Sequence, residues 1–260
     1  MKNFIKTYWK TILFFTLAGL VGGFFTGIYL LDSYPAEIKQ QLIEEINAAG
    51  LGQFPINILM GIISAYQAAG YGLILGTIGI ILAKKTGLWK DEKNITKKPL
   101  LTSVLVGVIG GFALILPDLL FFRKYSEAIM NSYAAKPTVV YILAAIIYGG
   151  VFEEVMLRLF MMSLIALLLH KLFERKQGQP TTKILITANA IAALLFAAGH
   201  LPATLSMIGN SPLIIFRCFL LNGAFGLLFG YLYRKYGLRY AMISHAGCHV
   251  VSKLIWILFV

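Results

Sequence analysis

The polar residues most able to do chemistry in this sequence lie in a stretch that is otherwise apolar. The segment GGVFEEVMLRLFMMS, residues 149–163, places Glu153, Glu154 and Arg158 inside an apolar run from Pro137 to Leu169 that carries no other charge. A charged side chain at the centre of a membrane helix costs roughly 2.5 to 3.5 kcal/mol on insertion scales. Such residues therefore usually face the interior of a bundle, where they have a partner or a function.

Helix geometry separates the two glutamates. At about 100° per residue, positions four apart differ by about 40° and positions five apart by about 140°. This spacing predicts an ion pair between Glu154 and Arg158, and it leaves Glu153 without a local counter-charge. A buried carboxylate without such a partner is a candidate general base. The stretch alone is equally compatible with a buried polar contact between helices.

Three of the four histidines lie deep in apolar segments. In FAAGHLPAT, His200 follows Phe196 by four residues, so both lie on one helix face. Pro202 disfavours helical geometry at Leu201, and we therefore expect His200 near the carboxyl end of a helix.

The last apolar segment carries a second histidine motif. His245 and His249 in SHAGCHVVSK are four apart, the spacing by which one helix face offers two nitrogens to a metal ion or a substrate. Lys253 continues this stripe, and we expect its ammonium group to extend toward the membrane surface. We interpret Asp118, near Arg123 and Lys124, as structural or topological, and likewise Arg217, within reach of the outer surface.

These motifs, in this order, resemble the CPBP family. Its members are intramembrane endopeptidases of the CAAX-protease and bacteriocin-processing type, also called Abi proteins. The resemblance covers residues 137–255 and rests on EExxxR at 153–158, FxxxH at 196–200 and a late histidine, His245, on successive apolar helices. It implies that Glu153 and His200 activate a water molecule for attack on a peptide carbonyl. It also implies that His245 and its neighbour stabilise the oxyanion, while Glu154 and Arg158 order the site.

One position departs from the family pattern. The fourth residue after the late histidine is commonly Asn or Asp in this family, and here it is His249. His249 can donate a hydrogen bond to an oxyanion, or it can complete a metal site with His200 and His245. The family is generally classed as metal-dependent, and a metal-free mechanism has also been argued for relatives. Two expectations therefore stand: zinc bound by Glu153, His200, His245 and His249, and a metal-free site.

The predicted activity is hydrolysis of a peptide bond in a membrane-associated or lipidated peptide or protein. Two other classes remain: a proton-coupled transporter in which Glu153, His200 and His245 relay protons, and a catalytically silent membrane scaffold. No repeated half or pair of broken helices favours the transporter, and most motif residues that a silent relative would lose are retained. The substrate, its prenylation and the oligomeric state stay open.

Membrane helices must position these side chains. The chain has 260 residues, of which 58% are hydrophobic and 13% charged, a composition typical of integral membrane proteins. We predict an all-α, polytopic transmembrane bundle of about seven spans, with eight as the alternative. The spans lie near residues 12–31, 55–83, 99–122, 137–169, 184–208, 212–233 and 240–260. The fourth is long enough that it must tilt, protrude or bend, with Gly149 and Gly150 as the expected place.

The charge distribution predicts the orientation in the cell membrane. Sixteen basic residues lie in the N-terminus and the loops 84–98, 170–183 and 234–239, against four in the opposite loops. The positive-inside rule therefore predicts a cytoplasmic N-terminus. Topology accounts for the excess of basic over acidic residues, 23 against 11, so we expect no nucleic acid as a partner. The expected partners are the lipid bilayer and a peptide substrate.

We expect one integrated membrane domain with two parts. Residues 1–136 would form N-terminal transmembrane helices, an outer amphipathic helix over residues 35–50 and the basic loop 84–98, and residues 137–260 would form the catalytic core. The first apolar stretch is long and no A-x-A-like site follows it, so we interpret it as an uncleaved span.

Overall fold

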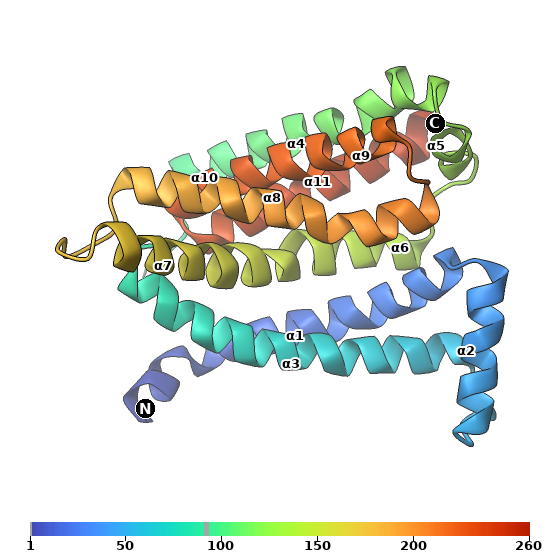
Figure 1. Cartoon of the computed structure of the whole chain (residues 1–260), viewed down its shortest axis with the longest axis horizontal. Helices are drawn as coiled ribbons and strands as arrows, with labels where there is room; N and C mark the ends of the chain where they lie inside the picture. The colour runs from blue at the N-terminus through green and yellow to red at the C-terminus, as the bar shows by residue number, and fades with distance from the viewer. Residues whose placement is uncertain (1, 91–93) are drawn as a thin grey trace.

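The computed structural model describes residues 2–90 and 94–260, and within these ranges every regular element is a helix (Figure 1). Seven helices of this part are long and apolar enough to cross a membrane: Asn3–Ser33, Ile56–Lys85, Lys97–Lys124, Val139–Phe173, Thr182–Met207, Pro212–Tyr236 and Leu238–Phe259. The all-α, multi-pass prediction is confirmed, with seven spans instead of eight. Lys93, which counts toward the basic loop, lies outside the described residues, as does the side chain of Lys2.

Two long N-terminal helices pack against each other through glycines. In α1 (Lys2–Ser33) a Cβ atom on Gly19 would lie 2.5 Å from the Ala68 carbonyl oxygen of α3 (Ile56–Lys85). Small residues allow membrane helices to approach this closely. Between them, α2 (Ala36–Ala48) has no buried residue and turns away from the bundle, as expected of an amphipathic surface helix (Figure 1).

The fourth span contains an unusual helix geometry. It begins as α6 (Val139–Leu143), continues through the π-helical segments η2 (Ala144–Phe152) and η3 (Val155–Met162), and ends as α7 (Ser163–Phe173). Hydrogen bonding to the fifth residue widens the helix, and π-helical turns occur frequently at functional sites.

The last three spans complete the core. They are α8 (Thr182–Met207), then α9 (Pro212–Cys218), η4 (Phe219–Gly223) and α10 (Ala224–Tyr236) as one span, and α11 (Leu238–Phe259). On the other side of α11 lies α4 (Lys97–Leu120), followed by η1 (Phe122–Lys124) and α5 (Glu127–Ser132). Gly107 of α4 packs closely on the backbone of Ser244 and Gly247.

The predicted end of the His200 helix is wrong. The α8 helix continues through Pro202 to Met207, so His200 lies inside the helix and not at its carboxyl end. Proline removes one backbone hydrogen-bond donor and so favours a break in the helix. Packing beyond Pro202 opposes this break, since the Thr204 hydroxyl lies 3.4 Å from the Cys218 sulfur. A helix dipole stabilises a cation only in the last turn, so it does not stabilise a protonated His200 at this position.

Candidate active site

A cavity of about 370 Å³ lies within the bundle and receives side chains from most of its helices. Four of the sequence-predicted site residues line it: Glu153, His200, His245 and His249. Glu153 comes from between η2 and η3, His200 from α8, and the other two from α11. The structure thus brings together side chains from the three separate motifs.

Glu154 and Arg158 lie behind this cavity and are completely buried. The Arg158 Nε atom is 3.3 Å from Glu154 Oε2, as the spacing of four residues predicts. The Arg158 guanidinium also lies over the Phe196 ring, 5.3 Å from its centroid. Such a contact partly compensates for a cation removed from water.

The second oxygen of Glu154 binds His245. Its Oε1 atom lies 3.0 Å from His245 Nδ1. An ionised carboxylate can only accept, so Nδ1 carries the proton, and Nε2 remains as the ring atom available to a ligand. Phe229 stacks on the His245 ring with centroids 4.3 Å apart, which fixes the ring plane. Glu154 therefore orients His245, a link between two motifs that the sequence does not indicate.

Glu153 and His200 face each other across the cavity. His200 Nε2 lies 4.0 Å from Glu153 Oε1. His200 Nδ1 is 2.9 Å from the Phe196 carbonyl oxygen, which can only accept, so Nδ1 is protonated and Nε2 of the neutral ring carries a lone pair. Two acceptors at this distance cannot bond directly, and the separation is that of groups bridged by one water molecule.

His249 stacks on His245, with ring centroids 5.0 Å apart. The absence of a side chain on Gly149 makes room for it, since a Cβ atom there would lie 2.9 Å from His249 Nε2. The next glycine, Gly150, lies against the α11 backbone, where a Cβ atom would be 2.5 Å from the Ala246 Cα atom. The paired glycines therefore set how closely the fourth span approaches the two histidines.

The predicted zinc ligands Glu153, His200, His245 and His249 all line this cavity. Within residues 2–90 and 94–260, no group of three or more His, Cys, Asp or Glu side chains is placed to hold a metal ion. Nδ1 of His245 is already bound to Glu154, and His249 packs on His245 by its ring face. The contact with Glu154 leaves His245 Nε2 available to a ligand, and metal-binding histidines commonly have a carboxylate on the other ring nitrogen. Zinc at these residues therefore stays a prediction.

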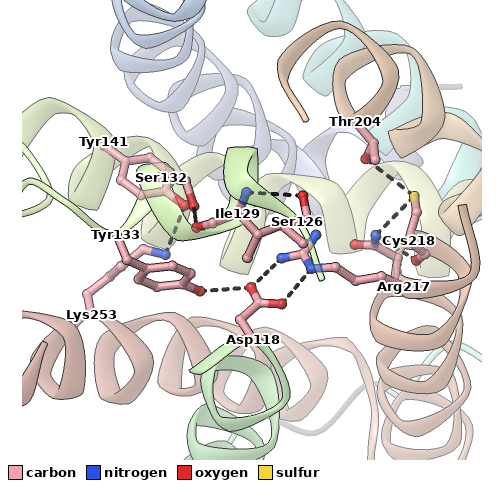
Figure 2. A network of polar contacts seen from close by, with 11 residues as sticks. Asp118, Ser126, Ile129, Ser132, Tyr133, Tyr141, Thr204, Arg217, Cys218 and Lys253 are labelled. Atoms are coloured by element: carbon pink, nitrogen blue, oxygen red, sulfur yellow. Dashed lines mark hydrogen bonds and ion pairs between the residues drawn. The ribbon is translucent and has the colours of Figure 1, made fainter. Parts of the chain in front are cut away.

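A polar network at the end of the cavity near α5 was not predicted from the sequence (Figure 2). Asp118 is 1% exposed and forms an ion pair with Arg217, and it accepts a hydrogen bond of 2.8 Å from the Tyr133 hydroxyl. Asp118 and Arg217 are 99 residues apart in the chain, so no local spacing could reveal the pair. The predicted neighbours Arg123 and Lys124 are not its partners.

The predicted orientation of Lys253 is also wrong. Its side chain does not extend to the membrane surface but points into the cavity, with Nζ 3.0 Å from the Tyr141 hydroxyl. Lys253 lies on the α11 stripe of His245 and His249, and this stripe faces inward. A residue four positions further along the same face must therefore face inward too.

Comparison with known families is consistent with this arrangement. The model of the type II CAAX prenyl endopeptidase Rce1-like family matches residues 135–251, which include every residue of the three motifs. Over these residues, which are less than half of the chain, the protein is similar to CAAX proteases. No curated protein and no solved structure matches the chain.

The seven helices long enough to cross a membrane make the chain a multi-pass membrane protein, and the family model that it matches is that of a peptidase family. The lipid bilayer is therefore a partner of these helices. Two charged residues of the cavity, Asp118 and Lys253, lie outside the matched residues.

Proposed function

We propose that this protein is an intramembrane endopeptidase that cleaves a membrane-associated or lipidated peptide or protein. The observation that carries the proposal is the 4.0 Å separation between Glu153 Oε1 and His200 Nε2 inside a cavity. Both atoms accept hydrogen bonds, so one water molecule can donate a proton to each and direct its lone pair at a bound carbonyl carbon. The family name supports a prenylated C-terminal CAAX peptide as the substrate.

The reaction needs only groups of this chain. Glu153 takes a proton as the water oxygen attacks the carbonyl carbon, and the carbonyl oxygen becomes an oxyanion. His245 Nε2 and His249 line the same cavity and, when protonated, can donate to that oxygen. When the tetrahedral intermediate collapses, the C–N bond breaks and the proton held by Glu153 passes to the leaving amine. Glu154 and Arg158 act indirectly, by holding the His245 ring.

The test is cleavage by purified protein in detergent. The probe is an internally quenched peptide with a farnesylated cysteine four residues from its carboxyl end, which is the CAAX arrangement. Glu153→Gln keeps the side-chain shape and removes the base, and the rate should fall about 10²- to 10⁴-fold.

Glu37→Gln provides the matched control, because Glu37 is an exposed glutamate of α2. This control should cleave at the wild-type rate. Undiminished cleavage by a folded Glu153→Gln variant would refute the assignment of Glu153. Absence of cleavage by the wild type, with proton flux in liposomes, would favour the transporter.

A further inference from the structure

Lys253 is a buried cation without an acidic partner. The residue is 7% exposed, and no carboxylate of the described residues lies within ion-pair distance of its ammonium group. Its ammonium group lies 3.0 Å from the Tyr141 hydroxyl (Figure 2). It also lies over the faces of two rings, 4.3 Å from the centroid of Tyr141 and 5.5 Å from that of Trp256. Intramembrane lysines usually pair with an anion or line a substrate path.

The other charges of the cavity do not neutralise Lys253. Asp118 is held by Arg217 and Tyr133, and Glu153 faces His200. With the Asp118–Arg217 pair balanced, Lys253 is the cation that remains at this end of the cavity. A negatively charged ligand group would therefore gain a charge-assisted hydrogen bond from a lysine that is itself buried.

We infer that Lys253 and Tyr141 form a subsite for the free carboxyl terminus of the substrate, an inference that rests on the proposed function. The Lys253 Nζ atom donates to the Tyr141 oxygen, so the hydroxyl proton of Tyr141 is free to donate to the same carboxylate. A carboxylate is the anion that every unmodified peptide carries at its end. The subsite would make cleavage depend on the distance of the scissile bond from that end.

The spacing along α11 sets that distance. Lys253 lies eight residues beyond His245, which corresponds to about 12 Å along the helix axis. An extended peptide spans about 3.3 to 3.6 Å per residue, so about three residues fit between the oxyanion position and the carboxylate. The subsite thus selects a bond about three residues from the carboxyl terminus.

The experiment compares two forms of the farnesylated peptide, one with a free carboxyl terminus and one with a C-terminal amide. Wild-type protein should cleave and bind the acid at least tenfold better than the amide. Lys253→Met keeps a long side chain and removes the charge. It should lower the cleavage rate and the affinity of the acid peptide to those of the amide peptide, and the values for the amide peptide should not change. Lys253→Arg should retain most of the preference.

Lys136→Met is the matched control. Lys136 is exposed, does not line the cavity, and directs its Nζ atom to the Trp256 carbonyl oxygen at 3.5 Å. This variant should keep the full preference for the acid.

The outcomes separate this inference from the proposed function. Equal cleavage rates and affinities of the acid and amide peptides with the wild type would overturn the subsite. An equal fall in the cleavage of both peptides by Lys253→Met would overturn it too, because a merely structural role would produce that result. Tighter binding of the acid that depends on Lys253, without any cleavage, would support the subsite and overturn the proposed function.

Discussion

Glu154 shows how a charge can be stabilised inside an apolar bundle. Arg158 contacts one of its oxygens and His245 the other, so the carboxylate has a partner on each side. Removing one partner of a buried ion pair lowers the stability of the folded protein by about 3 to 5 kcal/mol, because the remaining charge stays desolvated. We therefore regard Glu154 and Arg158 as positioning residues and reserve proton transfer for Glu153.

The metal-free reaction proposed for Glu153 and His200 leads to a prediction about metal removal. Treatment of the purified protein with 1,10-phenanthroline, followed by gel filtration, should leave the rate of peptide cleavage unchanged. The reason is that Glu153 and His200 can activate a water molecule without a metal ion, and no group of three metal ligands is placed to bind one within the described residues. Elemental analysis should find less than one zinc per chain. Loss of activity that zinc restores, with zinc content reduced in His249→Ala, would contradict this.

Local spacing predicted some residue contacts and could not predict others. The Glu154–Arg158 pair follows from one turn of helix. The contact between Glu154 and His245 joins residues 91 positions apart, and it depends on how the fourth span packs on α11. The prediction that Lys253 extends toward the membrane surface failed for the same reason. A lysine that reaches the surface and a lysine that lines a cavity occur at the same position in a sequence pattern.

At the scale of elements, two glycines of η2 control the approach of the fourth span to α11. The neighbour of Gly149 is the end of the His249 side chain, whereas the neighbour of Gly150 is the backbone of Ala246. A side chain can rotate, but backbone atoms can move only if the helices separate. The same substitution should therefore have different effects at adjacent positions.

We predict that Gly149→Ala lowers the cleavage rate at least tenfold with little change in thermal stability, because the His249 ring must leave its position. Gly150→Ala should instead destabilise the protein by about 1 to 3 kcal/mol, the usual cost of overpacking. Thermal unfolding in detergent and peptide cleavage measure the two effects. An unfolded Gly149→Ala variant, or an active one, would contradict the role of this glycine.

Hydropathy predicted the elements better than local residue preferences did. All seven spans follow from runs of apolar residues, because the bilayer requires about 20 of them per helix. Pro202 was misleading, since α8 continues through it. The π-helical segments were not predicted either, because their apolar residues would suit an α-helix equally well, and Gly149 and Gly150 indicated only that the geometry would be irregular.

At the scale of the whole molecule, the cavity lies toward one end of the bundle. Asp118, Arg217 and Lys253 all lie near the helix ends that connect to the loops of one side. Figure 1 shows α2, α5 and the C-terminus at this end, and the N-terminus with the loop between α7 and α8 at the other. The orientation of the chain therefore decides which side of the membrane the carboxylate subsite faces.

The last prediction concerns this orientation. Basic residues number sixteen on the side of the N-terminus and four on the other, so we expect the N-terminus in the cytoplasm and the Lys253 end of the cavity outside. Gln53→Cys and Gln177→Cys place exposed thiols on opposite sides, and the native Cys218 and Cys248 are buried. A membrane-impermeant maleimide should label Gln53→Cys in intact cells, and Gln177→Cys only after permeabilisation. The reverse pattern would place the subsite on the cytoplasmic side, where the substrate would then have to enter.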